Sequence, residues 1–391
     1  MKRALTLTVC FFIFCFAMHA TTPQQQIDSI MKCRYGSNAP GGGIMILKGD
    51  SVIMEKYYGI ADMTTGEQIS EKTRFNIASI SKQFTVVGAL RLVEQGKIAL
   101  DTPIAPFFPQ YSNPFWNDIK LWHLMSHTSG LPDSRDRSNR EACVFANDEI
   151  SMSYFPNVTQ LLFTPGSHYD YKNPTFILIA KIIEQCEGIN FVDYQKHHIF
   201  DHLGMNSTTY FNPNETPLHT AHGYINTQAD ELSSSDNDTA GKTIEISNTS
   251  NSIWQEYDYG EETFFATRPD GGIYSTLRDL AKWEKALREH IIITGSTLNT
   301  AYTPHITVTG SEWSSYQNRP NTHYGLGWFI DTTPEYPTKV YHTGDNGGFQ
   351  AYLAKFPQKN VTVIILENRN DNDRWSLVKT IDKILLEAGI L

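Results

Sequence analysis

The sequence of 391 residues predicts an α/β fold in which one antiparallel sheet is built from both ends of the chain. Paired β-rich runs occur near each terminus, and mainly helical patterns fill the region between them. Hydrophobic residues make up 40% of the chain, a composition typical of a protein with a large core. We expect one α/β unit over residues 21–391, with a sheet subdomain at about 21–75 and 320–391 and a helical subdomain at about 76–319.

The first twenty residues, "MKRALTLTVCFFIFCFAMHA", have the pattern of a secretory signal peptide. Lys2 and Arg3 precede an apolar run over residues 4–18, and the small residue Ala20 closes the segment. The run is shorter than the roughly 20 residues that span a bilayer, which favours a cleaved signal over a retained anchor. We therefore expect a soluble exported protein, periplasmic or secreted, with no stable membrane span.

The strand and helix signals at the two ends of the chain follow one another in a regular order. A helix is expected near residues 24–31, and "GGIMILKGDSVIMEKYYGIAD" then supplies two β-rich runs around a turn at Gly49 and Asp50. Near the other end, "FQAYLAKFPQKNVTVIILENR" repeats the hairpin pattern with a turn at residues 357–360. A final helix is predicted by apolar residues at helical spacing, namely Leu377, Ile381, Ile384 and Leu385.

The middle of the chain carries mostly helical patterns and loops. The segments "SKQFTVVGALRLVEQG", "PTFILIAKIIEQCEG" and "STLRDLAKWEKALREH" all have apolar residues at helical spacing. One polar stretch without periodicity, "TQADELSSSDNDTAGKTIEISNTSNS", indicates a surface excursion. The helical segments therefore form a long insertion between the strands of the two termini.

Charge and cysteine content exclude some partners. The net charge is −10, which argues against nucleic acid as a partner. Beyond the signal segment the chain has three cysteines, Cys33, Cys143 and Cys186, at spacings unlike any zinc motif. An exported location would permit one disulfide among them, and the sequence leaves the pairing open.

The stretch "ASISKQF" places Ser79, Ser81 and Lys82 close together at the start of a helix that is hydrophobic nearly all round. Residues three apart share a helix face and neighbours do not, so Ser79 lies beside Lys82 and Ser81 points elsewhere. Burial would disfavour the ammonium form of Lys82, leaving a neutral amine that can take the hydroxyl proton. An amide in the first helical turn is also free to donate to an anion. Ser79 is therefore the candidate nucleophile, although S-x-x-K alone is a weak motif.

The surrounding "RFNIASISKQFT" resembles the nucleophile segment of the serine β-lactamase and penicillin-binding protein superfamily. A second element, Tyr171, Lys172 and Asn173 in "PGSHYDYKNPTFILIAKIIEQCEG", resembles the Y-x-N element of the class C β-lactamase, DD-peptidase and esterase branch. A phenol near the serine and lysine can relay a proton to a leaving group. The Asn173 amide can hold a substrate carbonyl or position the lysine.

Three other candidates are set aside. An S-D-N tripeptide at residues 235–237 lies in the polar excursion, too far along the chain for the motif of that name. Tyr169 has a tyrosine instead of an asparagine two residues later, and we expect it to be a packing aromatic. His127, in "LMSHTSGLP", is given no catalytic role by the resemblance, and we expect it to be structural.

The third element implied by the resemblance is His342, Thr343 and Gly344 in "VYHTGDNGGFQAYLAKFP". Gly344 would let the backbone approach a substrate, and the amide of Asp345 would join that of Ser79 as an oxyanion hole. Thr343 can donate to a substrate carboxylate. Many class C β-lactamases have lysine where this chain has His342, and an unperturbed imidazole is mostly uncharged at neutral pH. We therefore expect weaker attraction for anions, with carboxylate binding that tightens as the pH falls through about 6.5.

The resemblance covers roughly residues 41–368 and implies the β-lactamase/transpeptidase-like fold. It implies that Ser79 attacks an acyl group, that Lys82 and Tyr171 move protons, and that no metal or organic cofactor is needed. H-T-G resembles DD-carboxypeptidases, D-aminopeptidases and esterase-like relatives, which points first to cell-wall peptides ending in D-alanine. The alternatives are an esterase or a β-lactamase with the same machinery, and a non-hydrolytic penicillin-binding receptor.

Overall fold

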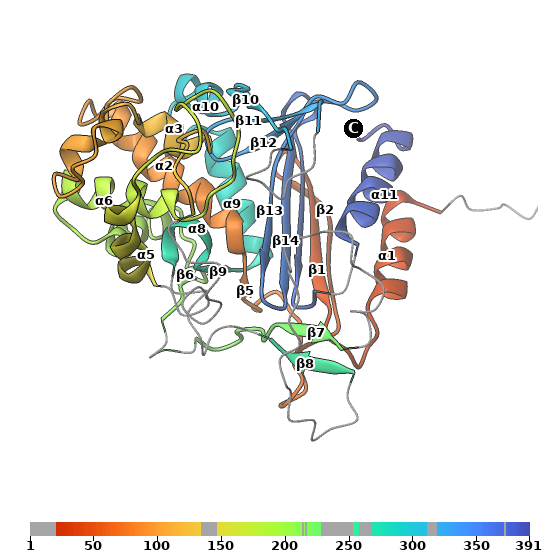
Figure 1. The fold of residues 1–391 in the computed structure, drawn as a ribbon. Coiled ribbons are helices and arrows are strands. Elements are labelled where there is room, and N and C mark those ends of the chain that lie inside the picture. The colour runs from red at the N-terminus through yellow and green to blue at the C-terminus, as the bar shows by residue number, and fades with distance from the viewer. Residues whose placement is uncertain are drawn as a thin grey trace, which may run out of the picture.

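The computed structural model describes residues 21–133, 147–212, 215, 217–227, 253–257, 267–310, 319–370 and 373–391. Its centre is an antiparallel sheet in the order β10-β11-β12-β13-β14-β15-β1-β2 (Figure 1). The strands are β1 (Gly42–Lys48), β2 (Ser51–Tyr58), β10 (Ile306–Thr307), β11 (Thr322–Tyr324), β12 (Phe329–Asp331), β13 (Lys339–Asn346), β14 (Phe349–Phe356) and β15 (Val361–Glu367). Because β1 from the N-terminal part pairs with β15 from the C-terminal part, the prediction of a sheet built from both ends of the chain is confirmed.

Helices cover both faces of the sheet. Helices α1 (Pro23–Arg34) and α11 (Arg374–Glu387) pack side by side on one face, and the helices of the insertion lie on the other (Figure 1). Successive strand residues point to opposite faces. Accordingly Ile44 and Ile46 of β1 join the core under α1 and α11, whereas Met45 and Leu47 join the core under the insertion. Burial on both faces explains why β1 is a continuous apolar run.

The remaining elements belong to the insertion and its connections. Its helices are η1 (Ala78–Ile80), α2 (Ser81–Glu94), η2 (Ala105–Phe107), η3 (Pro114–Asn117), α3 (Leu121–Met125), α5 (Asp148–Tyr154), η4 (Phe155–Asn157), α6 (Thr175–Glu187), α7 (Phe191–Gln195), η5 (Lys196–Phe200), α8 (Arg268–Gly271), α9 (Leu277–Arg288) and α10 (Gly295–Ala301). Short strands and one more turn complete the fold, namely β3 (Ile60–Asp62), β4 (Glu67–Gln68), β5 (Phe75–Asn76), β6 (Thr209–Tyr210), β7 (Tyr224–Asn226), β8 (Trp254–Glu256), β9 (Ile273–Ser275) and η8 (Pro357–Lys359).

Helix α2 runs through the middle of the insertion and is almost completely buried, as its apolar sequence predicts. Gly88 allows this close packing, because a Cβ atom there would lie 2.7 Å from Nε2 of Gln195. The side chains of Tyr194 and Gln195 instead donate hydrogen bonds to backbone carbonyls of α2. The catalytic candidates at the start of α2 are thereby attached to a rigid core element.

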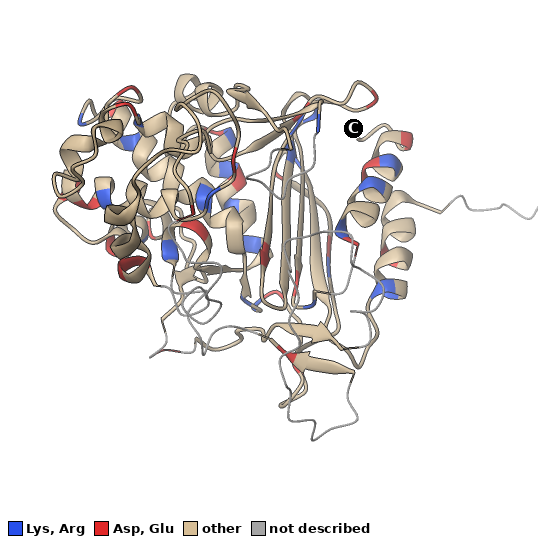
Figure 2. Ribbon diagram, viewed as in Figure 1, with Lys and Arg blue, Asp and Glu red and all other residues tan. Residues whose placement is uncertain are grey.

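Charged residues of both signs are interspersed along the helices on both sides of the sheet (Figure 2). Within the described residues, no helix is long and apolar enough to cross a membrane. The predicted signal peptide at residues 1–20, the S-D-N tripeptide at residues 235–237 and Cys143 lie outside the described residues. Cys33 and Cys186 are free thiols, so they do not form a disulfide with each other.

Candidate active site

Ser79 and Lys82 lie together where the insertion meets the sheet. Ser79 sits in the 3₁₀ turn η1 directly before α2, and Nζ of the fully buried Lys82 lies 3.0 Å from its Oγ. Ser81 points away, and its Oγ accepts a hydrogen bond from the backbone N–H of Ile273 at 3.2 Å. The structure therefore brings the predicted serine and lysine into contact and gives the second serine a structural partner.

The turn that carries Ser79 has an unusual backbone. Ala78 has a φ of 44°, in the left-handed region that costs a non-glycine residue about 1–2 kcal/mol. Oδ1 of Asn76 accepts a hydrogen bond from the Ala78 N–H at 2.9 Å and another from Nδ2 of Asn346 at 3.3 Å. Asn346 ends β13, so these two buried asparagines tie the nucleophile turn to the strand that faces it. Neither residue carries a motif that would reveal this role in the sequence.

The Lys82 ammonium group has a second partner that sequence reasoning missed. Its Nζ lies 2.8 Å from the backbone oxygen of Asp270, in α8. It also lies 5.0 Å from the ring centroid of Tyr171 and 5.4 Å from that of Phe176. A carbonyl that accepts one N–H orients the amine, so that the lone pair of the neutral form can face the Ser79 hydroxyl. This arrangement is suited to general-base catalysis by Lys82.

The ring of His127 packs against the ring of Tyr171. Their ring centroids lie 4.0 Å apart, and Nδ1 of His127 accepts a hydrogen bond from the Lys172 N–H at 3.1 Å. Burial, with a further contribution from the charge of Lys82, holds the pKa of His127 well below its ordinary value. His127 is therefore a neutral imidazole that positions the Tyr171–Lys172 backbone.

The two residues after Tyr171 differ in their partners: Lys172 forms an ion pair, and Asn173 has an acceptor oxygen without a hydrogen bond in the described part of the chain. Nζ of Lys172 forms an ion pair with Oδ1 of the buried Asp170 at 2.7 Å, which neutralises the lysine charge. Oδ1 of Asn173 is buried without a hydrogen-bond partner among the residues that the structure describes. Such an oxygen is suited to accept an N–H from a bound substrate. Tyr169 is fully buried in the core under α1 and α11, as expected for a packing aromatic.

Strand β13 brings the H-T-G element against the nucleophile turn. A Cβ atom at Gly344 would lie 2.2 Å from the carbonyl oxygen of Ile77 and 3.0 Å from Cβ of Ala78, so only glycine fits there. The side chain of Thr343 is partly buried, and Asp345, the next residue, has a half-exposed carboxylate. The Gly344–Asp345 segment and η1 are thus in direct contact, as a shared oxyanion hole requires.

His342 is buried, which overturns the expected pH dependence. Nε2 lies 3.0 Å from the hydroxyl of Tyr324, and Nδ1 lies 2.6 Å from the carbonyl oxygen of Thr343. Loss of hydration on burial, followed by repulsion from Lys82, lowers the pKa of His342 to about 3. The imidazole therefore stays neutral through pH 6.5, and the expectation of carboxylate binding that tightens there is wrong. The sequence could not reveal the burial, because it depends on packing with Tyr324.

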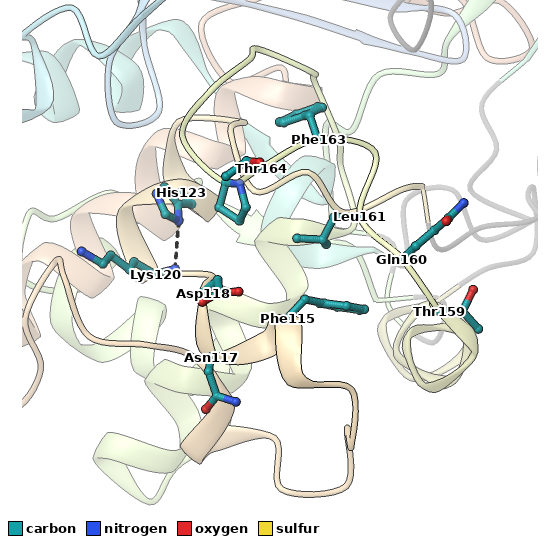
Figure 3. A pocket seen from close by; sticks show the side chains of 11 residues that line it. Phe115, Asn117, Asp118, Lys120, His123, Thr159, Gln160, Leu161, Phe163 and Thr164 are labelled. Carbon is teal, nitrogen blue, oxygen red and sulfur yellow. Dashed lines mark hydrogen bonds between the residues drawn. The ribbon is translucent and has the colours of Figure 1, made fainter.

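A surface hollow lies away from these residues. It has a volume of about 900 Å³, and its lining includes Phe115, Lys120, His123, Leu161 and Phe163 (Figure 3). His123 is one of the lining residues, and its Nδ1 accepts the N–H of Lys120 at 3.0 Å. None of the predicted site residues lines it. Within the described part of the chain, no cluster of three or more His, Cys, Asp or Glu side chains is arranged to hold a metal ion.

A sheet built from both termini, with a helical insertion and a serine–lysine pair between them, defines the class of serine β-lactamases and penicillin-binding proteins. The chain belongs to the beta-lactamase family, whose model matches residues 25–383. This confirms the resemblance inferred from the three motifs and the predicted fold.

Two curated relatives match most of the chain. Penicillin-binding protein 4* of Bacillus subtilis (strain 168) is 25% identical over 358 residues, which cover 88% of this chain and 72% of that protein. Protein flp of Staphylococcus aureus (strain MW2) is 24% identical over 360 residues, covering 89% of this chain and 63% of its own length. The chain therefore spans somewhat less than two thirds of protein flp.

Two solved structures share the fold. The octameric penicillin-binding protein homologue from Pyrococcus abyssi superposes with a TM-score of 0.73 at 24% identity, covering 93% of this chain and 77% of that one. The D-amino acid amidase from Ochrobactrum anthropi SV3, in complex with D-phenylalanine, gives a TM-score of 0.73 at 20% identity, covering 94% and 99%. These likenesses establish the architecture and leave the substrate to the chemistry of the site.

Proposed function

We propose that this protein is an exported serine hydrolase that cleaves small acyl compounds and peptides through an acyl-enzyme on Ser79. The observation that carries the proposal is the 3.0 Å contact between Oγ of Ser79 and Nζ of the fully buried Lys82. Burial disfavours the charged form of an amine, so a neutral Nζ is available to accept the proton of the Ser79 hydroxyl. The signal-like segment at residues 1–20 supports export to the periplasm or the medium.

The proposed reaction has two halves. In the first, Oγ of Ser79 forms a bond to the substrate carbonyl carbon while its proton passes to Nζ of Lys82. The N–H groups of Ser79 and Asp345 stabilise the oxyanion, and Tyr171 relays the proton to the leaving group as the scissile bond breaks. In the second half, water attacks the ester carbon and Ser79 leaves with the returning proton. Asn173 accepts an N–H from the acyl part of the substrate.

The first substrate class is a peptide that ends in D-alanine, or a related D-amino-acid compound. The order of the three motifs and the H-T-G strand support it. A penicillin-binding protein among the relatives and a D-amino acid amidase among the fold neighbours are compatible with it. Thr343 would donate a hydrogen bond to the terminal carboxylate.

A β-lactamase with the same machinery stays an alternative, but penicillins carry a carboxylate and are not favoured by a neutral His342. A second candidate is an esterase or amidase that acts on uncharged acyl groups. The neutrality of His342 favours it, because an uncharged imidazole provides no electrostatic attraction for a carboxylate. The charge of Lys172 is likewise neutralised by Asp170. Under this alternative the catalytic steps are the same and only the bound group differs.

Intact-mass analysis tests both candidates. The protein is exposed to benzylpenicillin, a D-alanyl-D-alanine peptide and a nitrophenyl ester, alongside Ser79→Ala and the matched control Ser81→Ala. The proposal requires an adduct or product that depends on Ser79 and survives Ser81→Ala. If no substrate gives one, the hydrolase assignment fails. Turnover of the peptide favours the first class, and turnover of the ester alone favours the second. A lasting penicillin adduct without turnover would indicate a receptor instead of an enzyme.

A further inference from the structure

Helix α11 lies on the face of the sheet opposite the insertion (Figure 1). Its first residue, Arg374, contacts two residues near the end of strand β13. Its Nη1 and Nη2 donate hydrogen bonds to Oδ1 and Oδ2 of Asp345 at 2.8 and 2.9 Å. Nη1 also donates to the carbonyl oxygen of Gly344 at 3.2 Å. The guanidinium is nearly buried, whereas the Asp345 carboxylate is half exposed. The planar guanidinium of Arg374 therefore binds both Gly344 and Asp345.

The contact with Gly344 bears directly on the oxyanion hole. The carbonyl of Gly344 and the N–H of Asp345 belong to the same peptide unit, since that amide joins the two residues. A hydrogen bond from a cation to the carbonyl oxygen draws electron density from the amide and strengthens its N–H as a donor. The bidentate pair with the Asp345 carboxylate limits rotation of the same unit.

We propose that Arg374 is a positioning residue that orients and polarises the Gly344–Asp345 peptide, so that the Asp345 N–H stabilises the oxyanion formed at Ser79. This inference rests on the proposed function, because it assigns Arg374 to the oxyanion hole of that reaction. Arg374 acts from behind the strand, through the peptide, and touches neither the substrate nor Ser79.

Other contacts attach α11 to the sheet, so Arg374 is not needed for that attachment alone. A second ion pair joins the same two elements, between Nζ of Lys339 in β13 and Oδ2 of Asp382 in α11, at 3.1 Å and nearly buried. Apolar residues of α11 also pack in the core, among them Leu377, Ile381 and Leu385. The Lys339–Asp382 pair lies at the other end of β13 from Gly344 and offers a matched control.

The experiment compares Arg374→Gln, Arg374→Lys and Lys339→Gln with wild type. Kinetics on a nitrophenyl ester and affinity for an arylboronic acid, which forms a tetrahedral adduct with the serine, are measured together with thermal stability. For Arg374→Gln we expect kcat to fall about tenfold with KM little changed, and boronate affinity to fall by a similar factor. This loss is smaller than the 10²–10³-fold effect of removing an oxyanion donor, because the N–H remains. Arg374→Lys should recover part of the loss.

Lys339→Gln should lower stability and leave kcat and boronate affinity unchanged. The proposal is overturned if Arg374→Gln keeps its kcat, or if Lys339→Gln lowers kcat and boronate affinity equally. If Arg374→Gln does not fold, Arg374→Lys and Asp345→Asn decide the question, and unchanged kcat in both rejects the inference. A wild-type protein that forms no Ser79-dependent adduct rejects the proposed function itself. An active wild type with unaffected Arg374 variants rejects the positioning role alone.

Discussion

The hydroxyl of Tyr324 and Nε2 of His342 form a hydrogen bond of 3.0 Å in the buried space near Lys82. The carbonyl oxygen of Thr343 only accepts, so Nδ1 of the same imidazole carries a proton and donates to it at 2.6 Å. Burial lowers the pKa of His342 to about 3, which leaves Nε2 unprotonated and able to accept from the Tyr324 hydroxyl. The ring stands at the lysine position of the K-T-G motif, and here it is uncharged and held by a hydrogen bond at each nitrogen. This relationship has consequences for both substrate binding and stability.

The first prediction concerns the pH dependence of substrate binding. The pKa of His342 lies at about 3, so its charge does not change between pH 5.5 and 7.5. The KM for a D-alanyl-D-alanine peptide should therefore show no decrease as the pH falls through 6.5. Steady-state kinetics across this range test the expectation. If KM decreased as the pH fell through 6.5 in wild type but not in His342→Gln, the imidazole would be shown to become protonated in that range.

The second prediction concerns stability in acid. In the unfolded chain the His342 imidazole titrates near 6.5, whereas in the folded chain its pKa is about 3. Between these values the unfolded state binds a proton that the native state does not, so the free energy of unfolding decreases as the pH falls. The slope from this one group is at most about 1.4 kcal/mol per pH unit. Urea unfolding at pH 7, 6, 5 and 4 should show a shallower decline for His342→Gln, and an equal decline would contradict the assignment.

The third prediction separates the two serines. Ser81→Ala leaves the buried N–H of Ile273 without its acceptor, which should cost about 1–3 kcal/mol of stability and leave kcat nearly unchanged. Ser79→Ala should keep its stability and lose kcat by at least about 10³-fold. Chemical denaturation and ester hydrolysis of the two variants check this opposite pattern. If Ser81→Ala lost activity at full stability, the assignment of Ser79 as the nucleophile would be contradicted.

The fourth prediction concerns the contact between β13 and the nucleophile turn. A Cβ atom at Gly344 would lie 2.2 Å from the Ile77 carbonyl oxygen, so Gly344→Ala must push the strand away. We expect a loss of about 1–3 kcal/mol from the strain and a fall in kcat of the order of 10²-fold, because the Asp345 amide moves off its target. Gly36→Ala is the control, since an added Cβ there meets only Cβ of Ala39 at 3.9 Å. Full activity in Gly344→Ala would show that the close approach is not required.

Much of the fold could be predicted because its signals are local. Turns at Gly49–Asp50 and at residues 357–360 separate β-rich runs, and both hairpins appear as expected. The choice of Ser79 over Ser81 also needed only helix periodicity, although Ser79 lies in a 3₁₀ turn just before the helix instead of its first α-helical turn. The resemblance of the three motifs to a known family predicted that the distant segments around Ser79, Tyr171 and His342 would meet at one site.

The residues that sequence reasoning missed act through contacts between distant segments. Asp270 binds Lys82 through a backbone carbonyl, an atom that every residue has, and so no side-chain pattern could reveal it. Tyr324 belongs to none of the three motifs, and its partner His342 is 18 residues away along the chain. Arg374 follows the last strand and carries no motif at all, yet it grips the Gly344–Asp345 peptide.

By itself the sequence determined the α/β architecture, the identity of the serine and lysine pair, and the order of the elements that face it. The first two features depend on periodicity and spacing, which a linear chain records directly, and the third was implied by the resemblance of the motifs to a known family. Only the tertiary structure decided the charge of His342, the partner of Lys82 and the support behind the Asp345 amide. Charge state and hydrogen-bond geometry depend on burial and on neighbours brought together by folding, and neither is written in the local order of residues.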